Sequence, residues 1–242
     1  MSSKAIVRRT LGRIKRFVLN PKQVLMRRFH PRLREEIRLA RLTGPGGYWQ
    51  ELRAYQLNFL KTMGLQPHHS LLDIGCGPLQ GGIAFMSYLE PGNYVGIDIR
   101  DVPLTEAYKQ IVKHRLVHKS PHLILSDSFG QNELNGRLFD YAWACQMLYH
   151  LDEAALHRYF ECVAKHLKPG GVLYGDILSP DNKIPDDVLW NGLRHRYHTM
   201  EFMETTSRQY GLAMKHVGQI KDYGYPVPCD LRLNDMLQFQ KQ

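Results

Sequence analysis

Two glycines, Gly75 and Gly77, follow the short apolar run at residues 71–74. Glycine permits tight turns and lets a ligand lie directly against the main chain. The run has the character of a buried parallel strand, and residues 80–89 have helical spacing with apolar side chains on one face. A strand, a glycine turn and the start of a helix together predict a nucleotide-binding site. The alternative is a turn that only joins the strand to the helix.

Acids end the next two predicted strands. Residues 94–98 end on Asp98, and residues 122–127 end on Asp127. Periodicity predicts further strands at residues 139–145 and 172–177 and helices at residues 48–63, 104–118 and 152–167. This alternation predicts an α/β, doubly wound, mostly parallel sheet with helices on both faces. Right-handed crossovers then place the glycine turn and both acids at one edge of the sheet.

The end of the chain has a different pattern. Residues 199–210 form a predicted helix, and two predicted strands follow at residues 212–221 and 231–240. Only a loop separates these strands, so we expect them to pair antiparallel.

Composition limits the class of protein. Four cysteines are spread without a CxxC pair, which fits a reducing compartment and predicts a cytoplasmic protein. No apolar run approaches the roughly 20 residues that span a bilayer, and no signal peptide is visible. Residues 1–41 hold 13 Lys and Arg against two Glu, whereas in residues 42–242 the acids exceed the bases by two. The basic charge therefore belongs to the N-terminal segment.

This segment contains two basic helical patterns separated at Asn20 and Pro21. The glycine-rich residues 43–47 form a predicted hinge, which divides the chain into a basic helical extension, residues 1–42, and a main domain, residues 43–242. Such an extension can lie on an anionic membrane surface, and nucleic acid is the less favoured partner. A targeting peptide or a solvated arm that packs loosely on its own domain are the alternatives.

The landmarks of residues 48–242 are similar to those of the class I S-adenosylmethionine-dependent methyltransferase family. They are the glycine turn, Asp98, Asp127, the strand 139–145 with residues 147–151 behind it, and the turn at residues 167–171. The resemblance implies a Rossmann-like, seven-stranded sheet whose last strand is antiparallel. It also implies S-adenosylmethionine as the cofactor and methyl transfer as the reaction.

The resemblance assigns a role to each landmark. Gly75 and Gly77 would face the methionine part of the cofactor, and Asp73 would help to hold that part near its ammonium group. Asp98, with Ile99 beside it, would accept two hydrogen bonds from the ribose hydroxyls, because a carboxylate offers two acceptor oxygens.

The remaining landmarks would hold the adenine and the sulfonium. Asp127 would accept from the adenine amino group with Ser128 beside it, and Gln146 would face the reacting sulfonium. One position departs from the family, since Leu79 stands where a third glycine is usual. We therefore expect a longer turn here than the family's.

Methyl transfer from a sulfonium is an in-line displacement with a good leaving group, so orientation and desolvation can supply much of the acceleration. A hydroxyl acceptor must also lose a proton, and His150 is the candidate base because it follows the fourth strand at the predicted edge. The alternative for His150 is packing beside Asp152, which we expect to cap the next helix. Tyr149 would either shape the acceptor pocket or belong to the core.

Residues 179–199 separate the fifth strand from the next helix and form a candidate lid over the acceptor. Trp190 and Tyr197 can stack on a sugar or another ring, and His195 is a further candidate contact. An ordinary polar loop is the alternative. His195 and His198 have a spacing that could bind metal, but no matching carboxylate cluster accompanies them, so we predict no metal.

We therefore expect a methyltransferase that acts on a small molecule. The expected reaction is O-methylation of a sugar or another hydroxylated metabolite, and the acceptor can be lipid-linked. RNA methylation that uses the basic extension is one alternative, and a non-catalytic cofactor-binding or scaffold protein is another. A dinucleotide-dependent oxidoreductase would need glycine at Gln80. Because every cofactor landmark lies after residue 70, a chain that starts near Leu42 is expected to keep cofactor binding.

Overall fold

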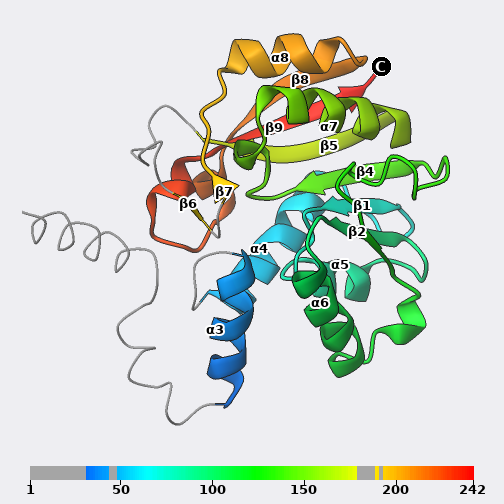
Figure 1. Cartoon of the computed structure of the whole chain (residues 1–242), viewed down its shortest axis with the longest axis vertical. Helices are drawn as coiled ribbons and strands as arrows, with labels where there is room; N and C mark the ends of the chain where they lie inside the picture. Colours follow the sequence, from blue (N-terminus) through cyan, green and yellow to red (C-terminus); the bar gives the residue numbers. More distant parts are fainter. Residues whose placement is uncertain (1–30, 44–47, 179–188, 191–192) are drawn as a thin grey trace, which may run out of the picture.

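The computed structural model describes residues 31–43, 48–178, 189–190 and 193–242 of the chain (Figure 1). Its main sheet consists of β1 (Leu71–Ile74), β2 (Tyr94–Asp98), β3 (His122–Leu125), β4 (Phe139–Ala144), β5 (Leu167–Ile177), β8 (Leu212–Gln219) and β9 (Asp235–Lys241). The order of these seven strands is β3-β2-β1-β4-β5-β9-β8. A short antiparallel pair, β6 (Leu189–Trp190) and β7 (Leu193–Arg194), forms a second sheet.

The order of the strands reverses at β1, which lies between β2 and β4. The chain adds β2 and β3 on one side of β1 and then returns to place β4 on the other side, and all these pairs are parallel. The carboxyl ends of β1 and β4 meet at this reversal, where ligands bind in open α/β sheets. β9 runs antiparallel to both β5 and β8. The predicted Rossmann-like sheet with an antiparallel C-terminal strand is confirmed.

Helices cover both faces of the sheet. They are α3 (Pro31–Thr43), α4 (Trp49–Thr62), α5 (Gly82–Tyr88), α6 (Asp101–Lys113), α7 (Glu153–His166) and α8 (Met200–Arg208). One buried apolar cluster contains side chains of α4, α5 and α6, and the other contains side chains of α7 and α8. Because Leu71 and Leu72 of β1 fall in different clusters, the two groups of helices lie on opposite faces.

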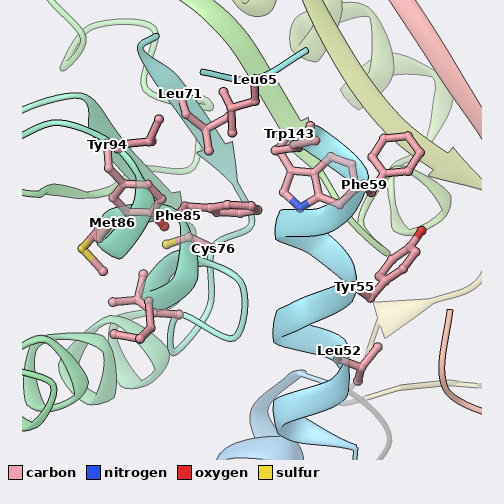
Figure 2. Close-up of a cluster of buried hydrophobic side chains, with 14 of the residues drawn as sticks. Leu52, Tyr55, Phe59, Leu65, Leu71, Cys76, Phe85, Met86, Tyr94 and Trp143 are labelled. Carbon is pink, nitrogen blue, oxygen red and sulfur yellow. The ribbon is translucent and has the colours of Figure 1, made fainter. Parts of the chain in front are cut away.

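Aromatic side chains hold α4 against the sheet, as Figure 2 shows. The ring of Phe59 in α4 lies 5.4 Å from that of Trp143 in β4, and the ring of Phe85 in α5 lies 6.5 Å from that of Trp143. The indole N–H of Trp143 donates to Gln56 Oε1 at 2.9 Å, so the buried donor is paired. α4 is therefore anchored directly beside the switch in strand order.

Several elements differ in extent from their predicted ranges. α6 begins at Asp101 and ends at Lys113, because Arg115 adopts a left-handed φ of 59°. β3 ends at Leu125, because the Ser126 hydroxyl accepts the backbone N–H groups of Ser128 and Gly130 and turns the chain.

The strands near the C-terminus also differ. β5 begins at Leu167, earlier than predicted, and the Lys-Pro-Gly-Gly stretch forms an irregularity between β4 and β5, with Gly170 at a φ of 77°. β9 begins at Asp235, because Asp230–Leu233 forms a 3-10 turn. The predicted cap of α7 is present, since the carboxylate of Asp152 accepts the backbone N–H of Ala155 at 2.8 Å.

Part of the basic extension packs on the domain. α3 lies beside α4 in Figure 1, and its side chains Leu39 and Ala40 are buried together with Trp49. Residues 1–30, which include the first basic pattern, lie outside the described residues. Most of the hinge, residues 44–47, lies outside them as well. Across the described ranges, none of the helices is both long enough and apolar enough to cross a membrane.

Candidate active site

A pocket of about 290 Å³ lies over the carboxyl ends of β1, β2 and β4. Gly75 and Gly77 line it, with φ values of 79° and 53° that glycine adopts without strain. The backbone N–H of Gly75 donates to the Ile97 carbonyl at 2.8 Å, so the turn is fixed to β2. A Cβ on Gly75 would lie 3.1 Å from the Met147 side chain. The glycine turn therefore exposes main chain to the pocket, as the sequence predicts.

The turn continues beyond the second glycine. Leu79 is buried and adopts a left-handed φ of 65° at the position where the family usually has glycine. Such a φ costs a non-glycine residue on the order of 1 kcal/mol or more. Gly81 lines the pocket, and a Cβ there would lie 2.4 Å from Gln56 Oε1. The turn thus runs to Gly81, and α5 begins at Gly82.

Asp98 ends β2 at the floor of the pocket and is only 5% exposed. Its Oδ2 accepts the Gly77 N–H at 2.9 Å, and its Oδ1 accepts the Arg100 N–H at 2.9 Å. Each carboxylate oxygen has a second acceptor position, so two further hydrogen bonds from a ligand can be accepted. This geometry suits a vicinal diol. Ile99 also lines the pocket and is 63% exposed.

Asp73 lies in β1 beneath the glycine turn, and it too lines the pocket. Its Oδ2 accepts the Tyr94 hydroxyl at 2.7 Å. Burial, together with the charge of Asp98, raises the pKa of Asp73 to about 7, although the Tyr94 hydrogen bond acts in the opposite direction. Asp73 therefore titrates near neutral pH, and it can hold an ammonium group when it is ionised.

The predicted adenine-binding residues follow β3. Asp127 lines the pocket and is exposed, so its carboxylate is available to a ligand. Ser128 is half-buried, and its hydroxyl lies 3.1 Å from that of Ser126. Ser126 and Phe129 line the pocket on either side of these residues. The structure therefore brings Asp127 to the site and holds Ser128 in the turn beneath it.

Gln146 lines the pocket directly after β4 and adopts a left-handed φ of 55°. Its backbone N–H donates to Asp176 Oδ1, and its side-chain amide donates to the Tyr225 hydroxyl. Asp176 is fully buried and also accepts from Asn234 Nδ2 at 2.7 Å. Burial raises the pKa of Asp176 to about 6, and the bonds from Asn234 and Gln146 limit that rise. This network fixes the strained residue that faces the pocket.

Comparison with known proteins agrees with this geometry. Residues 72–173 match a family described as a methyltransferase domain. An S-adenosylmethionine-dependent methyltransferase from Clostridium acetobutylicum superposes with a TM-score of 0.60 at 17% identity, over 80% of this chain and 92% of that chain.

Two further solved structures show the same fold. Magnesium protoporphyrin IX methyltransferase from Synechocystis, solved with bound cofactor, gives a TM-score of 0.60 at 14% identity, over 93% of this chain and 98% of that chain. The CcbJ methyltransferase from Streptomyces caelestis gives 0.62 at 13% identity, over 78% of this chain and 96% of that chain.

Residues 72–173 therefore form a methyltransferase domain, and the chain has the fold of S-adenosylmethionine-dependent methyltransferases. S-adenosylmethionine is its cofactor, and it supplies an electrophilic methyl group on a sulfonium. The residues present fit this group, because the glycine turn leaves open main chain and the half-used carboxylate of Asp98 suits the ribose. The roles of the single residues remain those that the family resemblance implies.

His150 lines the pocket of this methyltransferase from the 3-10 turn Leu148–His150. Its Nδ1 lies 3.3 Å from the Arg194 carbonyl oxygen. Because a carbonyl oxygen only accepts, this contact assigns the proton to Nδ1 and leaves the Nε2 lone pair free. Burial lowers the pKa of His150 to about 4, with His195 and Arg100 adding to the effect. The imidazole is therefore neutral at physiological pH.

The predicted acceptor contacts occupy different places. Tyr149 and His195 are buried, with exposures of 2% and 4%, and their rings lie 5.4 Å apart beside His150. Tyr197 is 38% exposed and does not line the pocket. Trp190 lies in β6, and its side chain, like most of the predicted lid at residues 179–199, lies outside the described part.

The segment after β7 packs along the turn that carries His150. The backbone N–H of Arg196 donates to the Tyr149 carbonyl at 2.8 Å, and the Arg196 guanidinium donates to the His150 carbonyl at 2.8 Å. His198 Nε2 donates to the Leu151 carbonyl at 3.0 Å. His195 and His198 are therefore part of this packing. Within the described residues, no group of three or more His, Cys, Asp or Glu could hold a metal ion, and the prediction of no metal remains a prediction.

Two parts of the site were not predicted from the sequence. Leu42 and Thr43, at the end of α3, line the pocket. Tyr225 and Asn234, from the loop between β8 and β9, reach Gln146 and Asp176. For Leu42 and Thr43, the sequence offered one indication of packing. The helix that they end has apolar residues in its last turns, and it contains two acids, Glu35 and Glu36. The second part had no local signal, because the loop reads as an ordinary connection.

Proposed function

We propose that this methyltransferase transfers the methyl group to a hydroxyl of a small molecule, a sugar or another hydroxylated metabolite, lipid-linked acceptors included. The observation that carries the proposal is the position of His150 in the cofactor pocket, where its ring is held through Nδ1. Its Nδ1 proton is engaged by the Arg194 carbonyl, so Nε2 is the atom that can accept the proton of the acceptor hydroxyl.

The surroundings of His150 support this role. Gln146 and Met147 line the same pocket, so the base lies on the side where the resemblance places the sulfonium. Orientation and exclusion of water supply the remaining acceleration, since the sulfonium is a good leaving group. A small acceptor also agrees with one structural relative, which is named as a magnesium protoporphyrin IX methyltransferase.

The test uses the full chain with S-adenosylmethionine and a panel of sugars, phenols, polyprenyl-linked sugars and an RNA oligonucleotide. Formation of S-adenosylhomocysteine and the mass of the product identify the acceptor. His150→Gln is expected to lower kcat by roughly 100-fold, because a positioned base contributes about that much. Its affinity for the cofactor should stay within about twofold.

His157→Gln is the matched control. His157 lies in α7, where its ring contacts the Tyr210 hydroxyl at 3.1 Å, and it does not line the pocket. The control should retain normal turnover. Normal turnover of His150→Gln on the same acceptor would reject the base, and methylation of the RNA alone would reject the small-molecule acceptor.

A further inference from the structure

The end of α3 reaches the cofactor pocket. Leu42 and Thr43 are its last two residues, and both line the pocket. The methyl carbon of Thr43 lies 2.9 Å from the position that a Cβ on Gly77 would occupy. The N-terminal helix therefore touches the glycine turn itself, at the side of the pocket where Asp98 lies.

Arg100 connects this helix end to Asp98. Its Nη2 donates to the Leu42 carbonyl at 3.0 Å, and its Nε lies 3.5 Å from Asp98 Oδ1. The backbone N–H of Arg100 also donates to Asp98 Oδ1. One side chain thus links the last turn of α3 to the carboxylate that the family resemblance assigns to the ribose.

Further contacts hold α3 against α6, away from the pocket. Arg38 Nη1 lies 2.7 Å from Glu106 Oε2, and Glu35 pairs with Lys113 and accepts from Gln110 Nε2 at 3.0 Å. Lys109, and then Arg38, lower the pKa of Glu106, so it is ionised at neutral pH. Leu39 is buried, and it packs with Ala40 and with Trp49 of α4.

We propose that docked α3 is a component of the cofactor site, in which Leu42 and Thr43 form the wall beside the ribose and Arg100 aligns that wall with Asp98. Binding of the cofactor and docking of α3 then stabilise each other, because coupling between two equilibria is reciprocal. The apparent affinity for the cofactor depends on the fraction of molecules in which α3 is docked. On this proposal, a chain that starts near Leu42 should bind the cofactor more weakly, whereas the sequence led us to expect unchanged binding.

The first test weakens docking at the ion pair between Arg38 and Glu106, neither of which lines the pocket. Arg38→Glu and Glu106→Arg each place like charges together, and the double variant restores an opposite pair. Each single variant should bind S-adenosylhomocysteine on the order of 5-fold more weakly by calorimetry, and the double variant should return to within about twofold.

The matched control reverses a charge in a pair on α8, where Arg208 contacts Glu204. Arg208→Glu should leave the affinity for S-adenosylhomocysteine unchanged. An equal loss in this control would show that any reversed surface charge has the effect, and it would overturn the proposal.

The second test reads the coupling in the other direction, first in the wild-type chain and then in Arg38→Glu. Hydrogen exchange of the α3 amides at residues 37–43 in the full chain should slow when S-adenosylhomocysteine is added, whereas exchange in α8 should not change. Two results would overturn the proposal. One is α3 exchange that ignores S-adenosylhomocysteine, and the other is an Arg38→Glu chain whose α3 exchanges faster while its affinity stays normal. Neither result affects the proposed acceptor, because both tests measure cofactor binding alone.

Discussion

At the scale of single residues, Asp98 performs two tasks with one carboxylate. It accepts the N–H groups of Gly77 and Arg100, which shapes the turn, and it keeps acceptor positions toward the pocket. Asp98→Ala is expected to weaken S-adenosylhomocysteine binding by at least about 10-fold, because bonds to a charged acceptor contribute about 1.5–3 kcal/mol each. Calorimetry measures this loss. Asp101→Ala, at the exposed start of α6, is the control, and unchanged affinity in Asp98→Ala would reject the ribose role.

Asp73 gives a second prediction at this scale, for stability against pH. Its pKa is raised to about 7 in the folded chain, above the ordinary 3.8, so the folded state binds the proton more tightly than the unfolded state. This contribution to stability is complete below the unfolded pKa and is lost as the pH rises through 7. Between pH 6 and pH 8 the loss is about 1.4 kcal/mol.

The variant Asp73→Asn removes that contribution. Without cofactor, the free energy of unfolding in urea should decrease between pH 6 and pH 8 in both proteins. The decrease should be about 1.4 kcal/mol smaller in Asp73→Asn than in the wild type. Asp176, with a pKa raised to about 6, adds a decrease of the same sign in both proteins, so the comparison isolates Asp73. Equal pH dependence in the two proteins would show that Asp73 is ionised throughout this range.

At the scale of elements, one buried carboxylate joins three parts of the chain. Asp176 in β5 accepts from Gln146 after β4 and from Asn234 before β9. Asn234→Ala should lower the free energy of unfolding by about 1–3 kcal/mol, because it removes a donor from a buried charge. Denaturant unfolding measures the change. Asn58→Ala, on the exposed side of α4, should change stability by less than about 0.5 kcal/mol, and an equally small effect at Asn234 would contradict the network.

The elements also show what the sequence could and could not predict. The strand that ends on Asp98 and the glycine turn beside it carry local signals. The sheet and that side of the site were therefore predictable. His150 lines the pocket because it follows the end of β4, and its catalytic role stays a prediction. The contact between Thr43 and Gly77 was not predictable, because an arginine-rich helix has the same pattern whether it is docked or free. The bond from Asn234 to Asp176 joins residues 58 positions apart and has no local pattern.

At the scale of the whole molecule, the charge is divided between an N-terminal segment and a domain of nearly balanced charge. Residues 1–30 contain nine Lys and Arg and no Asp or Glu, and they precede the docked helix α3. We propose that this segment binds an anionic membrane surface, where each basic residue near the surface contributes about 1 kcal/mol. Apolar residues between the basic ones add to binding when they insert at the interface.

The bounds of α3 show where the chain can be shortened to test this proposal. A chain that begins at Pro31 removes nine of the basic residues but keeps α3, and with it the wall of the cofactor pocket. The full chain is expected to sediment with phosphatidylserine vesicles at low salt and to be released at high salt, because the attraction is screened. The shortened chain should stay in the supernatant while it binds S-adenosylhomocysteine normally. A salt-dependent shift of RNA oligonucleotides, with no vesicle binding, would assign the segment to nucleic acid instead. If the full chain binds neither partner, the segment serves another purpose, and a lipid-linked acceptor loses its main support.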